Sequence, residues 1–194
     1  MSILKNPKSE LLSLFVIILF TINLSQAQQF NLNNSESTLT VLGTSSLHDW
    51  HITEETQSGT IVFENIDNCN IKDCNIIMNA ESLKSGKNSM DKNTYKALKT
   101  DDYKTINFQL TNVEEVTNKG NGIYSVKSIG NLTIAGVKKQ IILNFTASIN
   151  GSKINLTGEK KIKMTDFNIN PPKALFGTIT TGDDITIKFS TTFI

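Results

Sequence analysis

Apolar and polar residues alternate from Ile123 to Ile149, with one break at Ala135-Gly136. A period of two over this length is typical of antiparallel strands with one buried face and one solvated face. The apolar face consists of Tyr124, Val126, Leu132 and Ile134 in the first strand and of Val137, Ile141, Leu143, Phe145, Ala147 and Ile149 in the second. The segment is therefore predicted to form a long antiparallel hairpin that turns at Ala135-Gly136.

The same alternation recurs in shorter segments on both sides of this hairpin. These segments are 39–41, 61–63, 74–80, 106–110, 154–164 and 185–193. Together with the hairpin they predict about eight antiparallel strands, separated by turn signals at Asn121-Gly122, Asn150-Gly151 and Gly182-Asp183. Only segment 89–99 departs from the pattern, and it is predicted to be a short helix capped by Asn88 or Ser89.

An all-β chain of this kind can form a two-sheet sandwich or a closed barrel, and periodicity alone does not distinguish them. An eight-stranded barrel is either filled by side chains or just wide enough for one slender ligand. The inward faces mix large and small residues, such as Ala147 beside Phe145 and Gly158 beside Leu156. Small residues either leave a lumen open or make room for neighbouring aromatic rings. The sequence therefore allows both an open and a filled barrel.

The first 27 residues have the features of a secretory signal peptide. Lys5 and Lys8 precede an apolar run over 11–20, and Ser25-Gln26-Ala27 forms a small-x-small cleavage site. The run is shorter than the roughly 20 residues of a membrane-spanning helix, although an uncleaved anchor is the alternative. We therefore expect residues 28–194 to form one domain that is periplasmic or secreted.

Charge balance limits the partners of this domain. The chain has 19 basic and 18 acidic residues, of which two basic and one acidic lie in the leader. Residues 28–194 therefore carry no net charge, which argues against nucleic acid or an anionic membrane surface as the main partner. A homodimer stays open as an alternative.

Cys69 and Cys74 are the two cysteines of the chain and form a candidate disulfide, because bridges persist outside the cytoplasm. A bridge between them needs a turn over 70–73, and the alternative is a pair of buried thiols. The absence of further cysteines or a nearby histidine argues against zinc, and no cofactor motif is present.

Five segments stand out, in this order along the chain: Ser46-Leu-His-Asp-Trp50, the helix and strand of 90–108, Gly130-Asn-Leu-Thr-Ile-Ala-Gly-Val-Lys-Lys139, Met164-Thr-Asp-Phe-Asn-Ile169 and Gly182-Asp-Asp-Ile-Thr-Ile187. Together they resemble the YceI-like family of periplasmic barrels that bind polyisoprenoids and other long apolar molecules. The resemblance implies a lipocalin-like antiparallel barrel with one helix at one end and a polyisoprenoid or other lipid in its lumen. The chain departs from the family pattern at three places: Met164-Thr165 replaces a common basic residue, Asn168 replaces a glycine, and Met90 replaces the arginine that often precedes the acidic residue Asp91.

The candidate lumen residues are the large side chains on the inward faces: Trp50, Phe63, Met78, Phe108, Tyr124, Leu132, Leu143, Phe145, Leu156 and Phe189. The candidate polar groups at the mouth are His48, Asp49 and Asp91. On a strand, His48 and Trp50 point to one face and Asp49 and His51 to the other, so the two imidazoles do not share a site. The leading hypothesis is a lipid-binding protein without catalytic residues. An enzyme that uses His48 and Asp49, and an interaction module with a filled barrel, are the alternatives.

Overall fold

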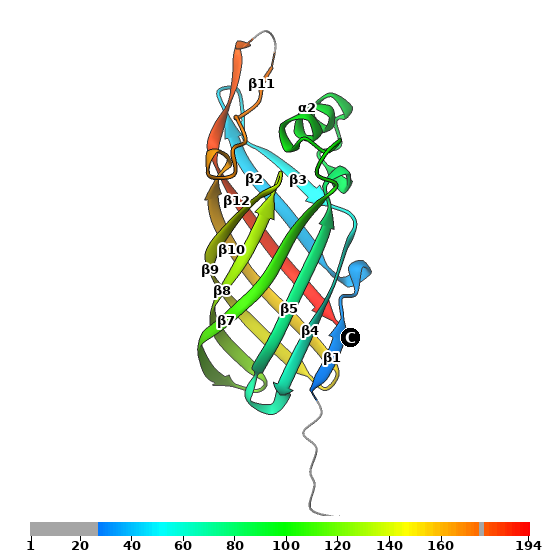
Figure 1. Ribbon diagram of the computed structural model, residues 1–194, viewed down its shortest axis with the longest axis vertical. Coiled ribbons are helices and arrows are strands. Elements are labelled where there is room, and N and C mark those ends of the chain that lie inside the picture. Colours follow the sequence, from blue (N-terminus) through cyan, green and yellow to red (C-terminus); the bar gives the residue numbers. More distant parts are fainter. Residues whose placement is uncertain (1–26, 175–176) are drawn as a thin grey trace, which may run out of the picture.

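The computed structural model describes residues 27–174 and 177–194, which form one curled antiparallel sheet with a helix at one end (Figure 1). The predicted leader lies outside the described residues. The strands are β1 (Gln28–Asn31), β2 (Thr38–Ser45), β3 (Trp50–Glu54), β4 (Gln57–Asn65), β5 (Asn70–Asn79), β6 (Leu83–Lys84), β7 (Thr105–Gly120), β8 (Ile123–Ile134), β9 (Val137–Asn150), β10 (Lys153–Lys163), β11 (Lys173–Ala174) and β12 (Ile179–Phe193). The α-helix is α2 (Asn88–Leu98), and short 3-10 turns lie at Asn34–Glu36, Ile66–Asn68, Ala80–Ser82 and Met164–Phe167.

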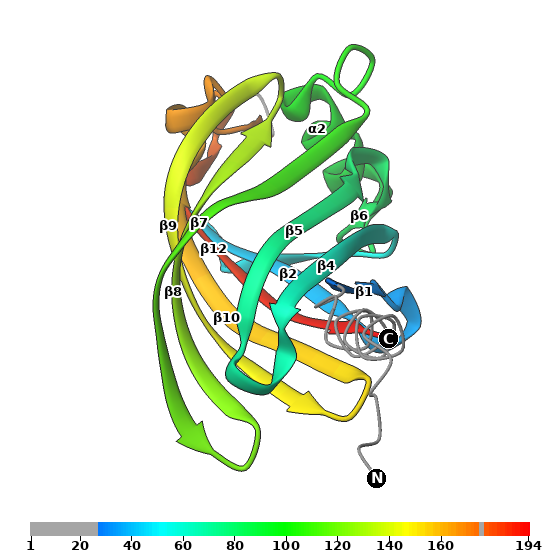
Figure 2. The ribbon, with the colours of Figure 1, turned by 60° about the horizontal axis from the view of Figure 1, so that its bottom comes forward.

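The sheet follows the order β1-β4-β5-β7-β8-β9-β10-β12-β2-β3-β6, with β11 paired to β12. Leu32, the residue that follows β1, forms a bridge with Phe193 at the end of β12. The backbone N–H of Asn31 donates to the carbonyl of Ile194 at 2.8 Å, and the N–H of Ile194 donates back at 2.9 Å. The sheet thus curls until its first strand lies between β4 and β12 at the lower end (Figure 2).

The all-β, barrel-like prediction is confirmed, but the prediction of about eight strands is wrong. Over residues 27–174 and 177–194 the sheet has twelve strands. Four of them were missed because β1, β3, β6 and β11 are short, with two to five residues each. A strand of this length shows at most two alternations, which is too few to register as a period.

The hairpin from Ile123 to Ile149 forms as predicted, and its turn conformation explains the break in the pattern. Ala135 and Gly136 have φ values of 48° and 78°, as the two central residues of a type I′ turn require. Asn121 and Gly122 make a second such turn, with φ values of 53° and 72°. Gly182-Asp183 was expected to be a turn, but it lies within β12, where the register with β2 shifts between Thr181 and Ile185. A bulge and a turn both favour glycine and aspartate, so the residues alone do not separate them.

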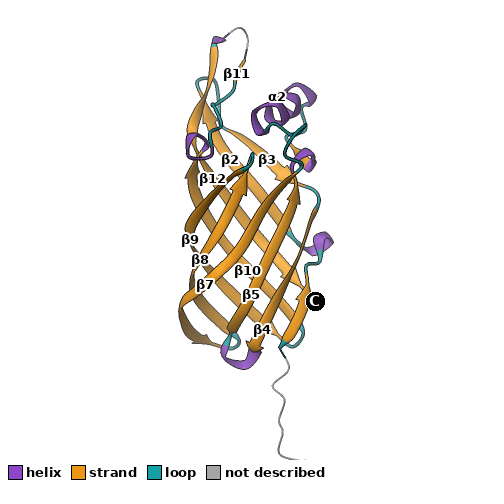
Figure 3. Ribbon diagram, viewed as in Figure 1, coloured by secondary structure: helices purple, strands orange, loops and turns teal. Residues whose placement is uncertain are grey.

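Helix α2 lies above the upper rim of the sheet, as Figure 3 shows by secondary structure. Its bounds match the prediction within one residue, but its capping does not. Lys87 is the N-cap and makes no side-chain hydrogen bond to the helix. At the other end Lys99 has φ of 54°, a left-handed conformation that ends the helix.

Candidate functional site

The upper half of the barrel encloses a cavity of about 360 Å³ between the sheet and α2. This volume falls within the range of small-molecule sites. The strands contribute mainly aliphatic and aromatic side chains to its wall: Leu39, Val41, Trp50, Ile52, Ile76, Met78, Leu83, Ile106, Phe108, Leu132, Ile134, Ile141, Leu143, Ile162, Ile179, Ile185, Ile187 and Phe189. Such a wall favours an apolar occupant over water.

Aromatic rings of the cavity wall pack directly against glycines in the strands. A Cβ atom built on Gly130 would overlap the ring of Phe108, and one on Gly43 would overlap the indole of Trp50. The indole is also fixed by its Nε1–H, which donates to the carbonyl of Thr44 at 3.0 Å. The rings therefore cover the backbone instead of crossing the lumen, which leaves the space between opposite walls open.

The lower half of the barrel is filled. Of the ten candidate lumen residues, Trp50, Met78, Phe108, Leu132, Leu143 and Phe189 line the cavity, whereas Phe63, Tyr124, Phe145 and Leu156 do not. These four residues lie in the packed lower half and are at most 8 % exposed. The open and the filled barrel, which the sequence left as alternatives, thus occur at different heights of the same sheet.

Particular contacts close this lower half. The rings of Phe63 and Phe30 meet edge to face with centroids 6.1 Å apart. The hydroxyl of Tyr124 donates to the carbonyl of Asp67 at 2.6 Å. Gly158 leaves no open space beside it, because a Cβ atom at this position would lie 2.8 Å from the ring of Phe189.

One face of α2 covers the mouth of the cavity. Met90, Thr94, Ala97 and Leu98 line the space, with the three-to-four residue spacing of neighbours on a helix face. On another face, the Tyr95 hydroxyl donates to the carbonyl of Glu81 at 2.7 Å and holds the helix against the chain before β6.

Asp91 anchors the helix and does not line the cavity. The residue is 7 % exposed, and its carboxylate accepts a hydrogen bond from the backbone N–H of Ser85 at 2.8 Å. The Ser85 hydroxyl donates to the same oxygen, and this bond is the main reason that the pKa of Asp91 is lowered. The expectation that Asp91 is a polar group at the mouth is therefore not supported by its position, because the helix turns this face toward Ser85.

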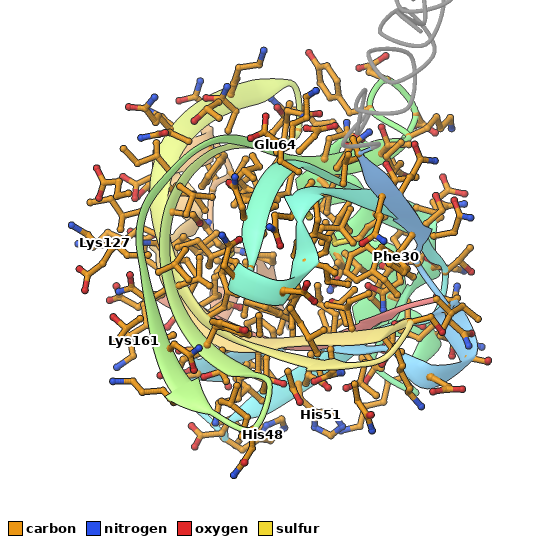
Figure 4. All side chains as sticks on the ribbon, turned by 90° about the horizontal axis from the view of Figure 1, so that it is seen from below. Phe30, His48, His51, Glu64, Lys127 and Lys161 are labelled. Carbon is orange, nitrogen blue, oxygen red and sulfur yellow. The ribbon has the colours of Figure 1, made fainter. Side chains whose placement is uncertain are left out.

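Within the His48-Asp49-Trp50-His51 segment, Trp50 and His51 begin strand β3 and point to opposite faces, whereas His48 and Asp49 lie in the exposed non-strand segment before it. His48 and Trp50 line the cavity, whereas Asp49 and His51 do not, and Figure 4 shows His51 on the outside of the wall. The Nδ1 atom of His48 lies 2.8 Å from the backbone carbonyl of Asp49 and donates to it. The side chain of Asp49 is exposed and absent from the cavity lining, so it does not pair with His48 over a cavity ligand.

Cys69 and Cys74 are free thiols, so the candidate disulfide is not formed. Both are buried, and burial raises the pKa of Cys69 to about 11 and that of Cys74 to about 12. In the described residues, no group of three or more His, Cys, Asp and Glu side chains is arranged to hold a metal ion. None of the described helices has the length and apolar character needed to cross a bilayer.

The family model of the YceI-like domain matches residues 30–193, nearly all of the described chain. The chain belongs to the YceI-like family. No curated protein sequence shows significant similarity to it.

Solved structures share the fold of this YceI-like chain. Burkholderia cenocepacia BcnA is 16 % identical, with a TM-score of 0.67 over 83 % of this chain and 98 % of its own. A polyisoprenoid binding domain from Saccharophagus degradans, implicated in plant cell wall breakdown, is 12 % identical, with a TM-score of 0.65 over 84 % and 97 %. The Campylobacter jejuni YCEI protein is 22 % identical, with a TM-score of 0.60 over 72 % and 81 %.

The YceI-like motif at Met164-Ile169 contributes three apolar groups to the cavity. Met164, Phe167 and Ile169 line its upper part. Asn168 stands where the family often has glycine, and its φ of 55° is the left-handed conformation that asparagine tolerates better than most residues. The substitution thus preserves the turn that aims Phe167 and Ile169 inward.

Alternation in the sequence identified the inward faces of this YceI-like barrel but not every group on the cavity. Val41, Ile141 and Ile187 lie on predicted inward faces, yet periodicity carries no information on height along the barrel. Lys160 is the clearest omission, because it stands in phase with the inward Gly158 and Ile162. The sequence signal that could have identified Lys160 is the interruption of an apolar face by a single lysine.

Two polar side chains are buried next to the cavity floor without full hydrogen bonding. Glu54 is the register partner of Leu39, and Gln57 is the partner of Met78. Ser82 and the N–H of Thr56 donate to one oxygen of Glu54, but within the described residues its Oε2 and both amide atoms of Gln57 have no partner. Burial raises the pKa of Glu54 because the site disfavours the charged form.

Replacing Glu54 by glutamine should raise the free energy of unfolding by about 1 kcal/mol at pH 7 and change it little at pH 4. A raised pKa in the folded state means that the folded protein binds the proton more tightly than the unfolded chain. The contribution of Glu54 is therefore fully present below its ordinary pKa and is lost as pH rises through the raised value. Urea unfolding of both proteins from pH 4 to pH 8 measures this. A variant that is equally destabilised at every pH would contradict the assignment.

Proposed function

We propose that this YceI-like protein binds a long apolar or amphiphilic molecule, such as a polyisoprenoid or another lipid, in the upper cavity. The observation that carries the proposal is the apolar wall of the cavity, with glycines that keep aromatic rings against the strands and α2 across the mouth. Each methylene moved from water into such a wall contributes about 0.8 kcal/mol. A few isoprene units thus supply ample gross affinity without a reactive group.

The family and the fold support this ligand class. The structural neighbour from Saccharophagus degradans is described as a polyisoprenoid binding domain, and it shares the architecture over most of both chains. The ligand is expected to occupy only the upper half, because the lower half is filled by side chains such as Phe63 and Tyr124.

Binding without turnover is part of the proposal. Among the described residues, His48 is the imidazole on the cavity, and its Nδ1 is engaged by the backbone of Asp49. The enzyme alternative pairs His48 with the Asp49 carboxylate as acid and base, and the Asp49 side chain does not line the cavity. We further propose that the protein acts in the periplasm or outside the cell after loss of residues 1–27, where it carries, stores or senses its ligand.

The test is extraction of lipid from protein purified from an exporting cell, followed by mass spectrometry. A long-chain lipid that co-purifies in near-stoichiometric amount is the expected result, and N-terminal sequencing of the same sample should begin at Gln28. Absence of any bound lipid, together with no uptake of added long-chain isoprenoids, would contradict the proposal. Conversion of an isoprenoid by the wild-type protein but not by His48→Ala would instead favour an enzyme.

A further inference from the structure

The titratable side chains on the described cavity lining are all basic. Lys87, Lys173 and His48 are exposed at the mouth, and Lys160 is half-buried on β10. No aspartate or glutamate is among the described lining residues. Since basic and acidic residues balance over 28–194, this bias belongs to the cavity and not to the whole domain.

Lys160 lies deeper than the other three basic groups. Its register partner on β12 is Ile187, which also lines the cavity, and Gly158, two residues earlier, is paired with Phe145 of the filled half. Lys160 is therefore the deepest residue that β10 contributes to the cavity. The next residue, Lys161, points to the outside of the barrel (Figure 4).

The ammonium group of Lys160 has no partner among the described residues. The described ion pairs involve Lys104, Lys127, Lys153 and Lys188, and none of the described side-chain hydrogen bonds comes from Lys160. An ammonium carries three donors, and a position among aliphatic side chains costs free energy unless an acceptor of opposite charge is supplied. An oxyanion on the ligand would supply it.

We infer that the ligand is an anionic amphiphile whose carboxylate or phosphate pairs with Lys160 at the deep end of the cavity. The inference rests on the proposed function and names the chemistry of its ligand. The hydrocarbon chain then contacts the apolar wall, and the basic groups at the mouth add a favourable potential for entry of an anion. A neutral lipid of the same length fills the same space but leaves the ammonium unpaired.

The experiment measures affinity for two matched pairs of probes by displacement of a fluorescent apolar dye. The pairs are hexadecanoate with hexadecanol and geranylgeranyl phosphate with geranylgeraniol, so that the polar group differs while the chain is kept. Wild-type protein should bind the anion of at least one pair about tenfold or more tightly than its alcohol, as expected for a hydrogen-bonded charge pair. The pair with the larger ratio identifies the oxyanion.

Three variants locate the effect. Lys160→Met should lose most of the preference for the anion and keep affinity for the alcohol, whereas Lys160→Arg should keep the preference. Lys161→Met removes the adjacent outward lysine and should behave as wild type. Thermal melts establish that each variant folds, and Lys160→Gln is the second neutral variant if Lys160→Met does not.

Equal affinity of the wild-type protein for anion and alcohol in both pairs would overturn the inference and leave the proposed function standing. An unchanged preference in the neutral variants would also overturn it, because the anion would then be held elsewhere. If none of the four probes binds to the wild-type protein, both the inference and the proposed function fail.

Discussion

Replacing Phe63 by alanine should lower the free energy of unfolding by about 3–5 kcal/mol while changing the affinity for a long-chain ligand less than about twofold. The ring is fully buried in the filled lower half and packs edge to face on Phe30. Its removal leaves a cavity that surrounding strands do not collapse into, and the ligand space lies above it. Urea unfolding and ligand titration of the same preparation measure the two effects separately.

Phe189→Ala is the matched control, since it removes the same ring from the cavity wall. The ring of Phe189 borders open space on one side and is only partly buried. Its loss should cost less than about 2 kcal/mol of unfolding free energy, and it should weaken ligand binding more than Phe63→Ala does. Equal loss of stability in the two variants would mean that the barrel is filled at both heights.

Replacing Val41 by tryptophan should weaken binding of a long-chain ligand by about 100-fold and change the free energy of unfolding by less than about 1 kcal/mol. Val41 faces the cavity between Ile187 and Ile52, its register partners on either side. The indole would displace three or four methylenes of the ligand, each worth about 0.8 kcal/mol. Stability is preserved because the added ring enters open space, whereas overpacking a filled core typically costs 1–3 kcal/mol.

Leu42→Trp adds the same side chain to the outer face of β2 and should leave binding unchanged. Its register partners, Thr186 and His51, face away from the cavity. Dye displacement measures affinity for all three proteins, and thermal melts report their stability. A strongly destabilised Val41→Trp protein with normal ligand affinity in its folded fraction would contradict the position of the cavity.

The two-residue periodicity determined much of this fold, because side chains of a strand point alternately to its two faces whatever the strand's neighbours are. It predicted the hairpin of Ile123–Ile149, its turn at Ala135-Gly136 and the set of inward faces. It also predicted that Trp50 and His51 point to opposite faces, as they do at the start of β3. The helix was visible because segment 89–99 departs from that period.

The height of each inward residue was decided only by the tertiary structure. Leu143 and Phe145 are equivalent in the alternation, yet one lines the cavity and the other belongs to the filled half. The difference arises from register, because strands far apart in sequence bring Gly158 and Phe189 together beside Phe145. A short turn fixes the register of β9 with β10, but no short turn joins β10 to β12, so the pairing of Gly158 with Phe189 cannot be read from a local pattern. For the same reason, the sequence shows Lys160 only as a lysine that interrupts an apolar face. The fold shows that its ammonium group has no partner within the described part of the chain and faces an apolar cavity.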